Sequence, residues 1–560
     1  MRLAIALCLG LLCALPARAK VYAGAMIAAA NPLAVESGLK VLRAGGSAVD
    51  AAVAIQATLG LVEPQSSGLG GGAFMTVYDA RTRRVTAYDG RETAPAGATP
   101  DMFQRPDGST MTKGEAILSG RSAGVPGAMA MLALAQKEHG RLPWRDLFGD
   151  AERLASDGFA VSPRLAGMIA GAAPQARAPD TVAYFTNPDG SRMKAGDRLV
   201  NRAYAATLRR LAKEGPTAIL SGPVAADIVA RLAKGPLPGT MTLADLAAWR
   251  PREGEALCRP YRAWTICAPD APSGGPATLE GMGLLARTDI AAHGPADPVG
   301  WLLLAQAERL MYVDDARYIA DPAFVTVPVA GLLDPAYLDE RARSIGDERP
   351  GPAPAPGHPV GAPKVGADAT REPGGTSSFV VVDRWGEVVS ITTTVESVFG
   401  DGRMVDGFFL NNQLTDFSFS PRDADGTPAA NAVGPGKRPR SSMSPVIVLD
   451  GKRRFVAAVG SPGGPAIPSY VMKVLVGVLD WKLSMPTAIA LPNLIAFGDF
   501  YLSEPERFLP GVVAGLAARG VTLRSSFAAE GSGLHGIVVT SRGLEGGADP
   551  RREGVVRRCC

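Results

Sequence analysis

The residues with the clearest chemical potential stand where a glycine-rich stretch meets a run of β-branched residues. Gly374 and Gly375 come directly before Thr376, and the sequence then continues as SSFVVVD. If the peptide bond before Thr376 were cut, this residue would carry both a hydroxyl nucleophile and an α-amino group that can act as its base. Gly375 has no side chain, which gives the Thr376 hydroxyl access to the preceding carbonyl. The pattern indicates a self-cleaving acyl-transfer enzyme, and the alternative is an ordinary strand that begins after a linker.

Two shorter glycine motifs suggest other chemistry but lack the required context. Residues 68–73 (GLGGGA) match the spacing of a dinucleotide-binding loop, which needs a strand before it and a helix after it. Here the apolar pattern predicts the reverse order, a helix before and a strand after. Residues 120–124 (GRSAG) match the G-x-S-x-G elbow of serine hydrolases, but the residues before them make a poor buried strand. Neither motif is therefore favoured as a site.

Metal chemistry is also disfavoured. The four histidines of the chain are scattered, and the cysteines do not have the spacing of metal ligands. We therefore expect no metal ion and no cofactor.

The candidate nucleophile belongs to a predicted β-hairpin. Residues 376–383 and 387–395 are rich in β-branched residues and flank a short turn centred on Trp385. A three-residue loop sets the pairing register so that Thr376 lies opposite Thr394. The hairpin therefore predicts that a second threonine hydroxyl lies beside the first.

The segments before the hairpin have different patterns. Residues 31–62 have apolar residues at helical spacing in two blocks, which predicts two helices packed on a core. Residues 73–79 and 84–89 alternate like strands. Residues 350–375 are rich in proline, alanine and glycine, and predict a flexible linker. The nucleophile is thus expected at a junction between a linker and a buried strand.

Composition and the first residues indicate a folded, exported protein. There are 58 Lys+Arg against 54 Asp+Glu, so the formal charge of +4 gives no electrostatic case for nucleic acid or a polybasic membrane partner. With 46% hydrophobic and 20% charged residues, intrinsic disorder is excluded as a global description. Residues 1–19 combine a charged start, a short apolar core and an A-x-A site, which predicts a signal peptide.

The apolar core of this segment is too short to span a bilayer, so we expect a periplasmic or secreted protein without stable membrane insertion. In that compartment Cys258 and Cys267 form a disulfide or remain a buried reduced pair. Cys559 and Cys560, at the end of the chain, have no predicted role.

A series of motifs runs in a fixed order from about residue 24 to residue 552. They are NPLAVESGLKVLRAGGSAVDAAVA, SSGLGGGAFM, GRETAP, GVPG, PSGG, GTSSFVVVD, FFLNNQLTDFS, RPRSSMSP, GSPGG and GADPRR. In this series the sequence resembles the γ-glutamyltransferase family of N-terminal-nucleophile hydrolases. The resemblance implies an α+β fold, a four-layer αββα sandwich. It also implies a precursor that cuts itself into a large subunit, residues 20–375, and a small catalytic subunit, residues 376–560, which stay together non-covalently.

The resemblance also implies roles for individual residues. Thr376 corresponds to the nucleophile of both self-cleavage and catalysis, and Thr394 to the threonine that orients it. Arg91 corresponds to the arginine that binds the substrate α-carboxylate, which a guanidinium can hold through two hydrogen bonds. The other implied positions are Ser441 and Ser442 for the same carboxylate, Gln413 and Asp416 for the α-ammonium, and the N–H groups of Gly463 and Gly464 for the oxyanion.

One position departs from the family pattern. Glu396 stands where many members have an asparagine beside the substrate α-amino group. Its carboxylate would either bind the ammonium more strongly or exclude other head groups, and the alternative is a solvated charge at the end of a strand. The complete set is complementary to an amino-acid head group, so the implied substrate is a small γ-glutamyl compound such as glutathione. The acyl group on Thr376 would pass to water or to the amine of an amino acid or peptide.

Two other functions remain open at this stage. One is a cephalosporin-acylase-like amidase, which takes a glutaryl group that has a carboxylate but no ammonium. In that case Gln413, Asp416 and Glu396 would have no partner, and buried unpaired carboxylates are unfavourable. The other is an uncleaved homologue that acts as a binding protein, against which the intact set of Thr376, Thr394 and the two glycines argues.

Overall fold

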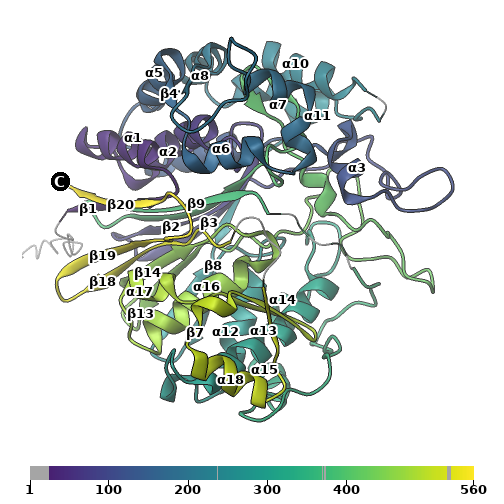
Figure 1. The fold of residues 1–560 in the computed structure, drawn as a ribbon, viewed down its shortest axis with the longest axis vertical. Helices are drawn as coiled ribbons and strands as arrows, with labels where there is room; N and C mark the ends of the chain where they lie inside the picture. Colours follow the sequence, from purple (N-terminus) through teal and green to yellow (C-terminus); the bar gives the residue numbers. More distant parts are fainter. Residues whose placement is uncertain (1–23, 236, 369, 371, 373, 526–530) are drawn as a thin grey trace, which may run out of the picture.

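Two antiparallel β-sheets lie face to face at the centre of the protein, and helices cover the outer face of each sheet (Figure 1). The computed structural model describes residues 24–235, 237–368, 370, 372, 374–525 and 531–560. The predicted signal peptide lies outside these residues. The arrangement is an αββα sandwich, which confirms the expected fold.

The first sheet has seven strands in the order β20-β1-β9-β10-β2-β3-β6. Their bounds are Val555–Cys559, Ala25–Ala29, Thr376–Val382, Val388–Thr394, Gly72–Asp79, Arg84–Asp89 and Arg252–Glu255. The second sheet has six strands in the order β19-β18-β14-β13-β8-β7. Their bounds are Gly543–Ala548, His535–Thr540, Phe455–Gly460, Val446–Asp450, Trp264–Ala268 and Leu257–Tyr261.

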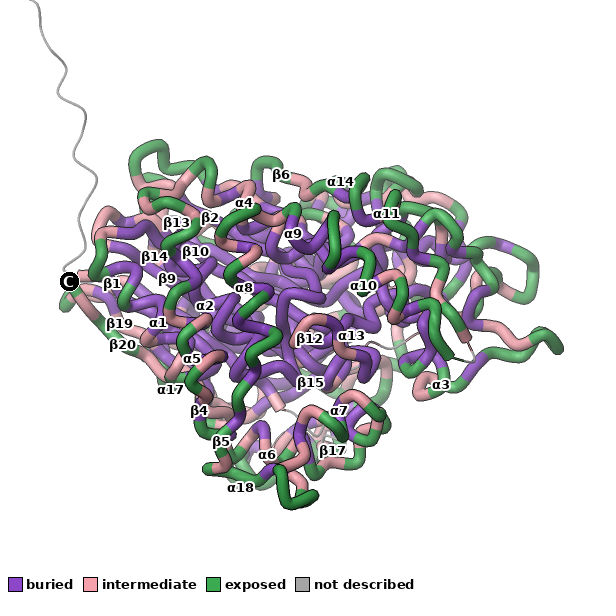
Figure 2. Tube along the Cα trace, turned by 90° about the horizontal axis from the view of Figure 1, so that it is seen from above, coloured by how far each residue is buried: buried purple, intermediate pink, exposed green. Residues whose placement is uncertain are grey.

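Strands β9 and β10 form the predicted hairpin at the middle of the first sheet. The register pairs Val382 with Val388 and Thr376 with Thr394, as the turn length predicted. Every residue of both strands is buried (Figure 2). A strand that is covered on both faces must be apolar or β-branched throughout, which explains the uninterrupted runs in the sequence. The candidate nucleophile therefore lies at the end of a rigid central strand.

The two predicted N-terminal helices cover one face of the first sheet. They are α1 (Pro32–Arg43) and α2 (Ala48–Val62). Asn31 caps the first helix, and Ser47 forms a capping box with Asp50 at the start of the second. All residues of α2 are buried, because this helix lies between the sheet and the outer helices of the same layer. The prediction of a packed helix pair is confirmed.

A second helical layer packs on the second sheet. Its main members are α12 (Gly275–Leu285), α13 (Pro298–Tyr318) and α16 (Ile467–Leu479), which share one apolar cluster with that sheet. A separate cluster fills the space between the sheets. The sheets approach each other closely at Gly460, the last residue of β14, where an added Cβ would lie 2.4 Å from the Ser378 hydroxyl oxygen. This close approach brings the loop after β14 near the start of β9, where Thr376 lies.

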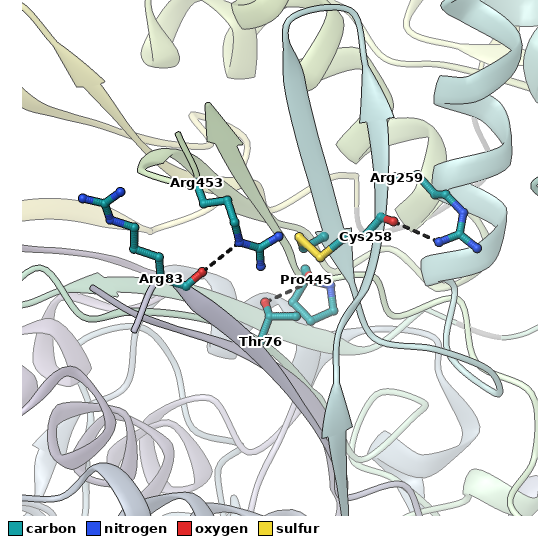
Figure 3. Close-up of a disulfide and its surroundings, with 7 residues drawn as sticks. Thr76, Arg83, Cys258, Arg259, Pro445 and Arg453 are labelled. Atoms are coloured by element: carbon teal, nitrogen blue, oxygen red, sulfur yellow. Dashed lines mark hydrogen bonds between the residues drawn. A yellow bond between two sulfur atoms is a disulfide. The ribbon is translucent and has the colours of Figure 1, made fainter. Parts of the chain in front are cut away.

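Cys258 and Cys267 form a disulfide between β7 and β8, where they are direct partners in the ladder (Figure 3). The reduced alternative is therefore not the state of this structure. Cys559 and Cys560 are also bonded to each other. Among the described residues, no helix is long and apolar enough to cross a bilayer.

The proline-rich segment after residue 350 has an irregular path across the second helical layer. Arg309 donates to the Gly351 carbonyl at 2.9 Å, and Tyr318 donates to the Gly357 carbonyl at 2.7 Å. Asp314 accepts from the Gly357 amide at 2.7 Å. These contacts lead the chain from the helices back to the start of β9.

Candidate active site

The two threonine hydroxyls and the carbonyl before the nucleophile form one hydrogen-bonded group. Thr376 Oγ1 donates to Thr394 Oγ1 at 3.2 Å, and Thr394 Oγ1 donates to the Gly375 carbonyl oxygen at 2.7 Å. The amide of Glu396 donates to Thr394 Oγ1 at 2.7 Å, which fixes the direction of this hydroxyl. Thr394 thus withdraws electrons from the carbonyl that Thr376 would attack. The group is buried and rests on the central hairpin.

Glycines give this group the space that it needs. A Cβ on Gly375 would lie 2.3 Å from the Glu396 carbonyl oxygen, so no other residue fits before the nucleophile. A Cβ on Gly71 would lie 1.9 Å from the Thr394 carbonyl oxygen. The GLGGGA motif therefore packs against the hairpin, and the order of helix α2 before it and strand β2 after it is the one that the sequence predicted.

The nucleophile is also held from the C-terminal segment. Arg552 Nη1 donates to the Thr376 carbonyl oxygen at 3.0 Å. Arg552 lies in the GADPRR motif, to which the sequence analysis gave no role. Its guanidinium fixes the peptide group on the far side of Thr376 from the scissile bond.

Arg91 is buried at the centre of the predicted head-group pocket. Its Nη2 donates to Asp416 Oδ2 at 2.8 Å and to the Arg440 carbonyl oxygen, and its Nε donates to the Pro439 carbonyl at 3.1 Å. Glu92 lies 3.9 Å from its Nη1. Sequence reasoning placed Arg91 and Asp416 on different parts of the substrate, and the structure joins them in a buried ion pair.

Glu396, Gln413 and Asp416 form a single acidic cluster. Gln413 Nε2 donates to Asp416 Oδ2 at 2.7 Å and to Glu396 Oε2. Within the described residues, Glu396 Oε1, Gln413 Oε1 and Asp416 Oδ1 are buried acceptors without a hydrogen-bond partner. Burial, the neighbouring Asp416 and then Glu372 raise the pKa of Glu396 well above its usual range. The solvated alternative for Glu396 is wrong, because only 5% of this residue is exposed.

Three unpaired acceptors in one buried cluster indicate a ligand that brings N–H donors. An ammonium group has three such donors and a positive charge. The cluster matches it in number, and it matches it in charge once Glu396 has released its proton.

Ser441 and Ser442 follow Arg440 along the same wall of the pocket. Ser441 Oγ accepts from the Met443 amide at 3.2 Å, and its own amide donates to the Pro272 carbonyl at 2.8 Å. The Ser442 amide donates to Glu372 Oε2 at 3.1 Å. Ser441 directly follows Arg440, whose carbonyl binds the Arg91 guanidinium.

Glu372 is a site residue that sequence reasoning missed. It precedes the nucleophile by four positions, and its carboxylate lies in the predicted head-group pocket, where it also interacts with Arg91 and Arg440. Burial and the nearby Asp416 raise the pKa of Glu372 to about 7, although Arg440 and Arg91 oppose the shift. Before cleavage, the Ser442 amide therefore donates its hydrogen bond to a carboxylate of the chain itself, that of Glu372.

Gly463 and Gly464 form the turn between β14 and α16. Their φ angles are 140° and 55°, in the region that favours glycine. A Cβ on Gly463 would lie 2.5 Å from the Tyr470 ring. In the described part of the chain, neither amide donates to another protein group, so both N–H groups are available to an oxyanion.

The G-x-S-x-G match is not a nucleophile elbow. Ser122 ends a short 3₁₀ helix, Gly120–Ser122, rather than following a strand. Its hydroxyl donates to the carbonyls of Ile117 and Ser119. It is a buried structural serine.

Comparison with known proteins decides the family. A family model described as gamma-glutamyltranspeptidase matches residues 34–559. The chain belongs to the γ-glutamyltranspeptidase family. The glutathione hydrolase proenzyme of Bacillus subtilis (strain 168) is 36% identical over 479 residues, covering 84% of this chain and 80% of that relative. That of Escherichia coli (strain K12) is 34% identical over 557 residues, covering 96% and 91%.

Solved structures extend the likeness of this γ-glutamyltranspeptidase family member to an acylase. The cephalosporin acylase from Bacillus halodurans superposes with a TM-score of 0.81 at 25% identity, and the match covers 97% of this chain and 98% of the acylase chain. The family resemblance and the fold are thereby confirmed. The roles given to individual site residues remain predictions.

Proposed function

We propose that this protein is a self-processing γ-glutamyltransferase with glutathione hydrolase activity. The observation that carries the proposal is the hydrogen bond from Thr394 to the Gly375 carbonyl, directly beside the Thr376 hydroxyl. We place the signal peptide at residues 1–19, the large subunit at 20–375 and the small subunit at 376–560. The processed enzyme acts in the periplasm or outside the cell.

Self-cleavage begins when Thr376 Oγ1 attacks the Gly375 carbonyl carbon. The bond between this carbon and the Thr376 nitrogen breaks, the nitrogen takes up a proton, and the Gly375 acyl group is left as an ester on the hydroxyl oxygen. Water then hydrolyses the ester and releases the Gly375 carboxylate. The freed α-amine of Thr376 becomes the base for later turnovers.

Catalysis uses the same nucleophile on a γ-glutamyl amide. The Thr376 oxygen attacks the γ-carbonyl carbon, and the N–H groups of Gly463 and Gly464 stabilise the oxyanion. The amide nitrogen leaves with a proton, and the γ-glutamyl ester passes to water or to an acceptor amine. The Gly463 and Gly464 amides, which donate to no group in the described part of the chain, support this assignment.

The head-group pocket selects a substrate that carries both an α-carboxylate and an α-ammonium. Arg91, Ser441 and Ser442 bind the α-carboxylate. Glu396, Gln413 and Asp416 bind the α-ammonium, and the three oxygens that lack a partner among the described residues support this role. The donor is therefore glutathione or a related small γ-glutamyl compound.

A glutaryl amidase is the second candidate, and the close superposition on a cephalosporin acylase favours it. A glutaryl group would leave the three acceptors unpaired, with a charged ligand carboxylate nearby. The two functions therefore differ in whether the substrate needs its ammonium.

The test combines processing and substrate choice on one sample. Intact mass and N-terminal sequencing should give two fragments, the smaller beginning at Thr376, and Thr376→Ala should remain one chain. The processed protein should release the aniline from a γ-glutamyl anilide and not from a glutaryl anilide, which differs only in lacking the ammonium. Preferred release from the glutaryl compound would overturn the γ-glutamyl assignment, and a single uncut wild-type chain would overturn self-processing.

A further inference from the structure

The glycine turn that carries the oxyanion donors is anchored from the neighbouring helix. Tyr312, on α13, donates its hydroxyl to the Pro465 carbonyl oxygen at 2.7 Å. Pro465 directly follows Gly464 and lies in the short 3₁₀ helix Gly464–Ala466. The bond therefore fixes a peptide group one residue after the second oxyanion donor.

A buried polar network holds the Tyr312 hydroxyl in place. The hydroxyl oxygen lies 2.8 Å from Ser469 Oγ, on the first turn of α16. One turn before Tyr312 on the same helix, Glu308 accepts from the Ala496 amide at 2.8 Å. The Tyr312 ring also packs on Phe497, with 4.2 Å between ring centres. None of these residues has a role in the reaction as described so far.

Glu308 contributes to this network in an uncharged form near neutral pH. Burial raises its pKa to about 8, against the opposing effects of the Ala496 amide and the Ser469 hydroxyl. A neutral acid beside Tyr312 avoids the cost of an unpaired buried charge.

The two glycines between Pro462 and Pro465 need such an anchor, because the prolines fix only their own φ angles and the glycine pair itself has little intrinsic rigidity. Two successive glycines have the largest conformational freedom in the unfolded chain and the weakest preference for one geometry. Oxyanion donors stabilise the transition state only when they are already oriented toward it. We infer that Tyr312, supported by Ser469, is a positioning residue that orients the oxyanion turn for the proposed γ-glutamyl transfer.

The inference rests on the proposed function, and the matched pair Tyr312→Phe and Tyr318→Phe tests it. Both tyrosines lie on α13 and each donates to one backbone carbonyl at 2.7 Å, but Tyr318 binds Gly357, away from the turn. In Tyr312→Phe, kcat should fall about 3- to 10-fold, because the free energy of one hydrogen bond corresponds to a rate factor of this size. The KM should not change. Tyr318→Phe should keep the wild-type kcat.

A second readout separates orientation from general damage. A boronic acid that carries a γ-glutamyl-like head group forms a tetrahedral adduct on the nucleophile, whereas L-glutamate binds only as a ground-state ligand. Tyr312→Phe should weaken the boronate by the same factor as kcat and leave L-glutamate binding unchanged. Equal weakening of both ligands, or equal effects in the two phenylalanine variants, would overturn the inference.

Two further results keep the test decisive. If Tyr312→Phe does not fold, Ser469→Ala should show the same selective loss of boronate affinity, and a wild-type boronate affinity in this variant would contradict the inference. A wild-type enzyme without γ-glutamyl activity would instead reject the proposed function. The two failures are therefore distinguishable.

Discussion

Replacing Glu372 by glutamine in a precursor that cannot cleave should open its head-group pocket to free ligands. In the precursor, the Glu372 carboxylate accepts from the Ser442 amide and faces Arg91 and Arg440. A substrate α-carboxylate needs the same environment. In a Thr376→Ala background the pocket stays in its uncleaved state, so L-glutamate must compete with this internal carboxylate.

The size of the effect follows from the charge that is lost, because the glutamine oxygen can still accept from the Ser442 amide. A hydrogen bond to a charged group contributes about 1.5–3 kcal/mol and a neutral one about 0.5–1.5 kcal/mol, a difference of about 1–1.5 kcal/mol. Since about 1.4 kcal/mol corresponds to a tenfold change in affinity, the second substitution should strengthen L-glutamate binding by about 5- to 10-fold. The pKa of Glu372 is raised to about 7, so its carboxylate is mostly ionised above this pH and mostly protonated below it. The difference in L-glutamate affinity between the precursors with and without the Glu372 substitution should therefore shrink as the pH falls below 7.

Isothermal titration calorimetry with L-glutamate measures both effects. The matched control is Glu348→Gln in the same Thr376→Ala background, because Glu348 is an exposed glutamate just before the proline-rich segment. The control should bind L-glutamate as weakly as Thr376→Ala alone. Equal affinity in the Glu372 variant and the control would refute the reasoning that Glu372 occupies the substrate site.

Three other predictions follow from the site and its surroundings. Thr394→Val keeps the shape of the hairpin but removes the donor to the scissile carbonyl, so self-cleavage should slow by about 100-fold or more, as seen by gel electrophoresis over time; cleavage at the wild-type rate would contradict this role. Burial raises the pKa of Glu396, so binding of a cationic head group should release a proton and KM should fall with rising pH, whereas Glu396→Gln should lose this dependence in steady-state kinetics. Replacing both Cys258 and Cys267 by serine should lower the free energy of unfolding by about 2–3 kcal/mol in chemical denaturation, because the disulfide closes a short loop of the unfolded chain; unchanged stability would show that the bond has no such effect.

Local sequence patterns were sufficient to predict the hairpin that holds the nucleophile. The turn at Trp385 sets the register, and the β-branched runs fit only a strand that is buried on both faces. The pairing of Thr376 with Thr394 therefore needed no information from distant parts of the chain. The N-terminal helix pair was predictable for the same reason, since its caps and apolar spacing are local.

The residues that were missed act through contacts between distant segments. Glu372 is one acidic residue in a stretch whose composition indicates a linker, and only the return of that stretch to the pocket gives it a partner. Tyr312 reads as one more apolar position of a buried helix, because its hydroxyl contacts Pro465 only after the second helical layer has assembled. Arg552 likewise reaches Thr376 across the sandwich. No local sequence pattern predicts such contacts between distant segments.

Strand order in the sandwich also sets how the two products of cleavage are joined. β1 lies between β20 and β9, β10 is paired with β2, and β13 is paired with β8. A cut before Thr376 leaves β1, β2 and β8 on one fragment and all of these partners on the other. Strands of the two fragments pair with each other in both sheets, so the fragments cannot separate unless this strand pairing is lost in both sheets. Dissociation of the fragments is therefore the same event as unfolding. The melting temperature of the cut enzyme should therefore rise with its concentration, whereas that of the uncut precursor should not, and folding cannot finish until residues 555–559 have been added to the edge beside β1.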